Sequence, residues 1–158
     1  MSPICLSLPF LILPLRHALF LLVALFLPYQ APNLPMKVLG WNYHGICNVM
    51  TVRALKAHVK RNSPDIIFFS ETKASVYRMK LVLKAIKFAD ICVVEAKGIA
   101  SGIYVMWKSS LSIYQVEYNK NLIALKVSDA LCNWLLVSFY DPSYPVKKRK
   151  AWENLWPF

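Results

Sequence analysis

Apolar positions between residues 36 and 73 follow two different periods. The short apolar runs 36–42 and 66–69 are typical of strands, and the second is continuous enough to be covered on both faces. Between them, Val52, Leu55 and Val59 recur at helical spacing, with Thr51 as the expected N-cap and a helix stop at 62–65. The pattern therefore predicts a β-α-β unit.

The rest of the chain continues this alternation and then changes character. Ser75 is the expected cap of a second helix, whose apolar stripe is formed by Val76, Met79, Leu83 and Ile86. Strands are predicted at 91–96, 103–107, 112–118, 122–127 and 133–140. Over 112–118 a regular alternation places Tyr114, Val116 and Tyr118 on one face. The expected fold class is α/β, a mixed and mainly antiparallel sheet with helices on one face.

Residues 1–35 differ from everything after them. They hold the unbroken apolar run 18–27, a single base, Arg16, and no acid. One interpretation is a signal peptide or membrane anchor, and the other is a gene-model extension translated from non-coding sequence upstream of Met36. The predicted domains are thus a leader, 1–35, and a domain, 36–158. We expect the strand at Met36 to pair only within 36–158, so that deleting the leader leaves the fold unchanged.

Charge points to an anionic partner. The chain of 158 residues carries 19 Lys and Arg against 8 Asp and Glu, a net charge of +11, and removing Arg16 with the leader leaves +10. Such a surplus favours DNA or another nucleic-acid backbone as the partner, and four of the bases are clustered at 147–150. The alternative is a solvated basic surface with no specific partner. The spacing of Cys47, Cys92 and Cys132 fits neither a zinc site nor a disulfide framework and predicts reduced, buried thiols. The domain alone indicates a nuclear or cytoplasmic protein, whereas a genuine leader indicates a membrane or secretory one.

Two polar residues stand at the ends of the predicted strands. Asn42 follows the first apolar run and Glu71 follows the second. A carboxylate at the end of a buried strand is costly unless it is paired or binds a cation, and Mg²⁺ is commonly held by one or two carboxylates with waters. The alternatives are a Glu71 side chain paired with Lys73 or an arginine, and an asparagine that forms a turn.

Three short sequences around these positions resemble a known superfamily. Residues 41–45 (WNYHG), 70–73 (SETK) and 138–140 (SFY) are similar in order and spacing to the endonuclease/exonuclease/phosphatase domain, nearest to that of plant non-LTR retroelements. The resemblance covers residues 36 to about 155. It implies that Glu71 holds Mg²⁺, that Asn42 orients the metal-bound carboxylate and the phosphate, and that Tyr140 contacts the scissile phosphate. The implied activity is Mg²⁺-dependent hydrolysis of DNA.

The chain also departs from that family. His44 stands where the family often has an acid or arginine, and Ser138 and Asp141 replace glycines beside Tyr140. The family's Asp-x-Asn and Asp-His pairs, which activate the water and polarise the phosphate, do not occur in these 158 residues. They belong to the second half of the family's fold.

A truncated domain follows from this departure. The expected structure is half of a four-layered sandwich, with about one sheet and an uncovered apolar face that includes Phe68, Val94, Val105 and Val137 and could bind a partner. We expect no nuclease activity from the chain alone. The alternative functions are a non-catalytic nucleic-acid-binding remnant and a small protein anchored in a membrane by 1–35.

Overall fold

The described residues form two five-stranded β-sheets and two helices, an α/β arrangement with mixed strand pairing. This computed structural model describes residues 4–7, 10–15, 18–27, 36–42, 46, 48–70, 74–94, 102–119, 122–128 and 133–140. Sheet A has the order β1 (Ile4–Ser7), β4 (Lys37–Asn42), β5 (Ile66–Ser70), β7 (Ile103–Trp107), β6 (Asp90–Val94). Sheet B has the order β2 (Phe10–Leu15), β3 (Ala18–Leu27), β10 (Asn133–Tyr140), β9 (Leu122–Ser128), β8 (Ser112–Asn119). The helices are α1 (Val49–Asn62) and α2 (Val76–Ile86).

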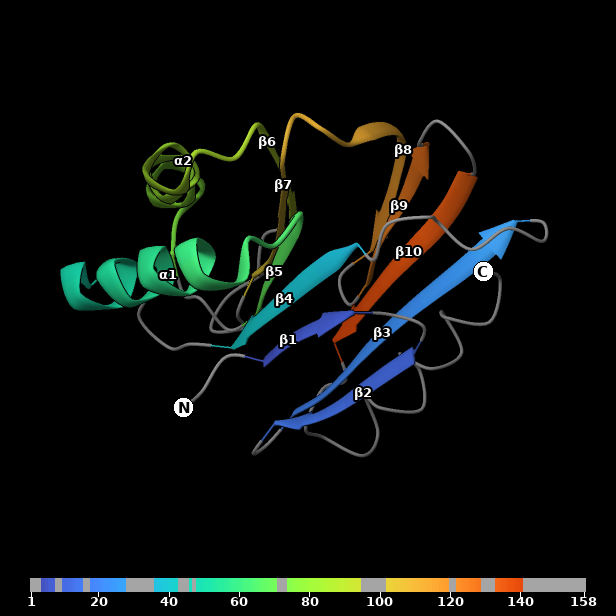
Figure 1. The fold of residues 1–158 in the computed structure, drawn as a ribbon, viewed down its shortest axis with the longest axis horizontal. Helices are drawn as coiled ribbons and strands as arrows, with labels where there is room; N and C mark the ends of the chain where they lie inside the picture. The colour runs from blue at the N-terminus through green and yellow to red at the C-terminus, as the bar shows by residue number, and fades with distance from the viewer. Residues whose placement is uncertain are drawn as a thin grey trace.

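The predicted β-α-β unit is confirmed. β4 and β5 pair in parallel, from Val38 opposite Ile66 to Asn42 opposite Ser70, and α1 connects them. The strands of sheet B form an antiparallel meander from β8 to β10. Figure 1 shows the two sheets facing each other, with α1 and α2 outside sheet A.

The main core lies between the two sheets. Phe68, Val94 and Val105 of sheet A share a buried cluster with Ile123 and Leu136 of sheet B. The expectation of about one sheet with an uncovered apolar face is therefore wrong for these residues, because a second sheet of the same chain covers them. Val137 is buried but lies outside this cluster, since it alternates with Leu136 along β10.

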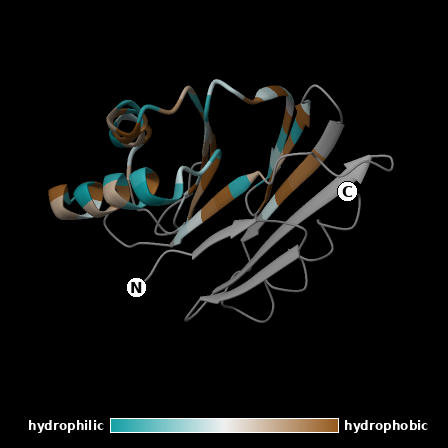
Figure 2. Ribbon diagram, viewed as in Figure 1, coloured by the Kyte–Doolittle hydropathy of each residue, from teal (hydrophilic) through white to brown (hydrophobic). Residues whose placement is uncertain are grey.

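A second cluster lies between sheet A and the helices. It joins Leu55 of α1 and Met79, Val82 and Ile86 of α2 to the face of sheet A that carries residues such as Phe69. Because β5 supplies both clusters, all five of its residues are buried, as the continuous apolar run predicts. Figure 2 shows hydrophobic and hydrophilic residues interleaved along α1 and α2, as expected for helices with one buried face.

The start of α1 differs from the prediction by one turn. The N-cap is Asn48, whose side-chain Oδ1 accepts a hydrogen bond from the Met50 backbone N–H at 3.0 Å. Thr51 lies inside the first turn and is buried, so it is not the cap. The predicted cap of α2 is confirmed, because Ser75 Oγ accepts a hydrogen bond from Arg78 N. Asn48 was missed because Asn and Thr both cap helices well. Thr51 was chosen only because it directly precedes Val52, the first residue of the apolar stripe.

A β-bulge changes the inward face of β8. The pairing of β8 with β9 shifts register between Ile113 and Gln115. Ile113 and Val116 consequently both pack against the core between the sheets, whereas Tyr114, the extra residue at the shift, is exposed. The regular alternation predicted for 112–118 is therefore wrong, since an extra residue in one strand reverses the order of faces beyond it.

The described part of residues 1–35 joins both sheets. β1 pairs antiparallel with β4, from Ile4 opposite Gly40 to Ser7 opposite Lys37, and β3 pairs antiparallel with the whole of β10. The expectation that the strand at Met36 pairs only within 36–158 is therefore wrong. The division into a leader and a domain remains a prediction. Among the described helices, neither is long and apolar enough to cross a membrane.

Candidate functional site

Two of the predicted site residues, Asn42 and Tyr140, are the last residues of strands. Asn42 is the last residue of β4 and is paired with Ser70, the last residue of β5, so Glu71 is the residue that follows this pair. Figure 1 shows β4, β5 and β10 finishing at the same end of the two-sheet sandwich, and Tyr140 is the last residue of β10. The side chains of Asn42 and Tyr140, and all of Glu71, His44 and Asp141, lie outside the described residues.

The chain on both sides of residues 71–73 is anchored. Ser70 is buried at the end of β5. On the other side, the Tyr104 hydroxyl of β7 donates a hydrogen bond of 2.6 Å to the carbonyl oxygen of Ala74, next to the Ser75 cap of α2. Tyr104 itself is only 2% exposed, so this bond forms largely away from water. Ser70 and Ala74 are thus both held by the fold.

Gly102 allows Tyr104 to take this position. A Cβ atom at Gly102 would lie 2.9 Å from Tyr104 Cε2 and 3.2 Å from the Val94 carbonyl oxygen, both closer than normal packing permits. The ring thus packs directly against the glycine at the entrance to β7. Neither Gly102 nor Tyr104 was predicted as part of the site, and their sequence signal, a glycine before an apolar run, resembles that of any strand start.

The end of β4 is fixed against α1. Trp41, which precedes Asn42, is buried in the cluster beneath the helices and meets the His58 ring edge-on, with centroids 5.3 Å apart. On β10, Ser138 is fully buried, and its Oγ has no hydrogen-bond partner within the described part of the chain. Ser138 lies on the same face of β10 as Leu136, toward sheet A. Ser138 thus places a polar atom between the sheets.

The opposite end of the β4–β5 pair is held by a carboxylate. Asp65 Oδ2 accepts a hydrogen bond from the Lys37 backbone N–H at 3.0 Å, and Asp65 Oδ1 lies 3.3 Å from Lys108 Nζ. Lys108 Nζ also donates to the Ser63 carbonyl oxygen at 3.1 Å. These contacts join the starts of β4 and β5 to the end of β7. Asp65 was predicted only as part of a helix stop, because Lys108 is distant in sequence.

No metal cluster or reactive thiol occurs among the described residues. They contain no group of three or more His, Cys, Asp or Glu side chains placed to hold a metal ion, and Glu71 is not among them. Cys92 is a free thiol, as predicted, but it is half-buried and not fully buried. This burial raises its pKa, with a smaller contribution from the negative charge of Asp90. A raised pKa lowers the thiolate fraction and hence the reactivity. Cys47 and Cys132 lie outside the described residues.

Comparison with protein-family models finds no match, and comparison with curated protein sequences finds none either. The resemblance to the endonuclease/exonuclease/phosphatase domain therefore depends on the short sequences that carry it and on the position of their residues at the strand ends.

Proposed function

We propose that the chain carries part of a Mg²⁺-dependent phosphodiesterase site of the endonuclease/exonuclease/phosphatase type, directed at DNA. The observation that supports this most strongly is the pairing of Asn42 with Ser70 at the ends of adjacent parallel strands. Asn42 ends the Trp-Asn sequence and Ser70 begins the Ser-Glu-Thr-Lys sequence, so the pairing supports a site shared by the two sequences. In such parallel pairs, polar residues beyond the strand ends are well placed to form a site.

Glu71 is the proposed metal ligand in this site. Its carboxylate suits Mg²⁺, which commonly binds through one or two protein carboxylates and completes its shell with water and substrate phosphate. Asn42 would orient that carboxylate and the phosphate, and Tyr140 would donate a hydrogen bond to a phosphate oxygen. When bound, Mg²⁺ stabilises negative charge on the phosphate oxygens. With a single carboxylate, binding of the ion should be weak.

The finer fold belongs to the same proposal. The family's four-layered sandwich has two facing sheets with helices outside each. The helices on sheet A and the facing sheet B support the assignment of this chain to part of that sandwich.

Nicking of supercoiled plasmid with Mg²⁺ tests activity. We expect the chain and its Glu71→Gln variant to nick at the same background rate. The family's water-activating Asp and phosphate-polarising His have no counterpart in these 158 residues, and losing members of a catalytic unit removes most of its effect. Nicking that depends on Glu71 would show that another residue, such as His44 or Asp141, replaces them.

Metal binding tests the site itself. In a calorimetric titration with Mg²⁺, the parent chain should show weak binding that Glu71→Gln abolishes. Asp65→Asn is the matched control, because it removes a carboxylate at the other end of β5 and should leave Mg²⁺ binding unchanged. Equal binding by the parent and Glu71→Gln would refute Glu71 as the ligand.

A non-catalytic nucleic-acid-binding protein is the second candidate, favoured by the many exposed bases on the helices. DNA binding without cleavage and without Mg²⁺ binding at Glu71 would support it. The third candidate, a small membrane-anchored protein, depends on residues 1–35, and cell fractionation separates it from the other two.

A further inference from the structure

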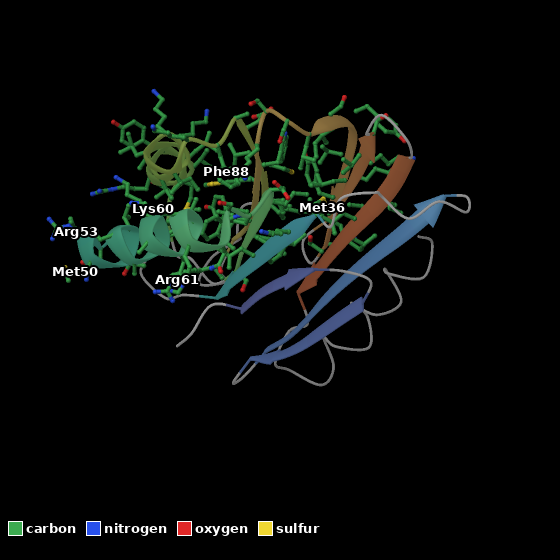
Figure 3. The ribbon with its side chains drawn as sticks, viewed as in Figure 1. Met36, Met50, Arg53, Lys60, Arg61 and Phe88 are labelled. Atoms are coloured by element: carbon green, nitrogen blue, oxygen red, sulfur yellow. The ribbon has the colours of Figure 1, made fainter. Side chains whose placement is uncertain are left out.

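The exposed sides of α1 and α2 carry only positive charge. Neither helix contains an Asp or Glu, and every Lys and Arg in them is exposed, as is Lys87 at the end of α2. These residues are Arg53, Lys56, Lys60 and Arg61 on α1, and Arg78, Lys80, Lys84 and Lys87 on or after α2. Figure 3 shows Arg53, Lys60 and Arg61 extending outward from α1.

Helix stability does not account for this distribution. The pairs Arg53–Lys56, Lys56–Lys60 and Lys80–Lys84 are three or four residues apart, where like charges repel by about 0.2–0.5 kcal/mol per pair. Bases in the last turn, Lys60 with Arg61 and Lys84, do favour the helix dipole. Arg78 in the first turn of α2 opposes it, and no carboxylate in either helix offsets the repulsion. A negatively charged partner would relieve this repulsion between the bases, and the relief would favour binding.

The spacing of these bases fits a phosphate backbone. Arg53, Lys56 and Lys60 occur at i, i+3 and i+7 and therefore lie along one side of α1 over about 10 Å. One DNA strand presents a phosphate about every 3.4 Å along the duplex axis, so this row spans about three phosphates. Lys80, Lys84 and Lys87 occur at i, i+4 and i+7 on α2, which packs beside α1.

We propose that these six residues, Arg53, Lys56, Lys60, Lys80, Lys84 and Lys87, form a basic helix surface that binds the phosphate backbone of duplex DNA without sequence preference. The surface lies on the outside of sheet A, apart from the strand ends that carry Asn42 and Tyr140. It does not depend on the proposed hydrolysis, so it can hold DNA whether or not Glu71 binds Mg²⁺.

An anionic membrane shares the charge chemistry but fits the helices less well. Interfacial helices insert an apolar face among lipid chains. The apolar faces of α1 and α2, with Leu55, Met79, Val82 and Ile86, are already buried against sheet A. The large apolar side chains still exposed on the two helices are two at the start of α1, Val49 and Met50, and two on α2, Tyr77 and Leu81.

Salt-dependent binding to a short fluorescent duplex tests the proposal. The helix variant Lys56→Gln, Lys60→Gln, Lys80→Gln, Lys84→Gln should lower the slope of log affinity against log salt by about 3–4, because each lost phosphate contact removes about 0.9. A charge-preserving variant with Arg at these positions should keep the parent slope. A location control, with Gln at Lys147, Lys148, Arg149 and Lys150, has the same net charge and should change the slope less. If the location control lowered the salt slope as much as the helix variant or more, the proposal would be overturned.

Two further measurements keep the result interpretable. The helix variant should unfold at the same or a higher temperature than the parent, because it loses repulsive pairs, so weaker binding cannot be ascribed to unfolding. Lysine acetylation read by mass spectrometry should show Lys56, Lys60, Lys80 and Lys84 protected by DNA more than Lys37. Absence of that protection, or tight binding to phosphatidylserine vesicles by a chain that does not bind the duplex, would refute the proposal.

Discussion

The two ends of the β4–β5 pair use polar residues differently. At the start, Asp65 bonds the Lys37 backbone and pairs with Lys108, and so joins three strands of sheet A. At the finish, Asn42 is paired with Ser70, Glu71 comes next, and the nearby Tyr104–Ala74 bond anchors the chain beyond it. The protein partners of Asp65 explain its carboxylate, whereas Glu71 lies outside the described residues. The comparison teaches that a strand-end carboxylate becomes structural when the fold brings a base to it.

The largest effect is expected from deleting residues 1–35. This deletion removes β1, which pairs with β4 between the two ends compared above. The deletion also removes β2 and β3 from sheet B and leaves the backbone of β10 unpaired on one side. We expect lower thermal stability and self-association, because an exposed strand edge is a template for pairing. Thermal melting and light scattering would measure both. If the deletion variant stayed monomeric with an unchanged melting temperature, the result would support a domain boundary at Met36.

Substitution at Asp65 should have the next largest effect. Asp65→Ala removes the acceptor of the Lys37 N–H and the partner of Lys108, and we expect the free energy of unfolding to fall by about 1.5–3 kcal/mol. Urea denaturation measures it, with Glu71→Gln as the control that should change it little. Combining Lys108→Met with Asp65→Ala in a double-mutant cycle isolates the contribution of the ion pair. Because both side chains are partly exposed, this contribution should be at most about 1 kcal/mol. A loss of stability in Glu71→Gln as large as that in Asp65→Ala would make Glu71 structural too.

Removing the anchor at the other end should cost less. Tyr104→Phe deletes one buried hydrogen bond to the Ala74 carbonyl and should lower the free energy of unfolding by about 1 kcal/mol. Gly102→Ala should add a comparable cost by displacing the same ring. The two changes should be non-additive, because they act on one contact. If each weakened Mg²⁺ binding no more than Asp65→Asn, the anchor would have no role in the site.

The smallest effect concerns Cys92, in β6 at one edge of sheet A. Because burial raises its pKa, alkylation in the native protein should require a higher pH than in the unfolded chain. The native state then retains the thiol proton to a higher pH, so this group lowers stability slightly as the pH rises above the unfolded thiol pKa. Mass spectrometry of the Cys92 peptide after alkylation at several pH values measures the shift. Equal pH profiles in the two states would show that the Cys92 thiol in β6 is open to water.

Local pattern in the sequence determined most elements of residues 36–140. The continuous run 66–69 predicted a strand buried on both faces, and the stripe through Leu55 and the cap at Ser75 predicted the two helices. These succeed because hydrophobic period and capping act over a few residues. Asn42 and Glu71 were predicted as site residues by the same local route, as polar residues at the ends of apolar runs. The register of β4 with β5 pairs Asn42 with Ser70.

Tertiary structure alone decided what each face and end meets. Nothing near residues 18–27 indicates that they pair with β10, and nothing near Phe68 indicates that Leu136 covers it. The bulge in β8 depends on its register with β9, and the role of Asp65 depends on Lys108, 43 residues away. Such contacts depend on which distant segments meet, and strand pairing and ion pairs leave no periodic mark in the chain. Local periodicity therefore predicts elements, while their partners appear only in the folded chain.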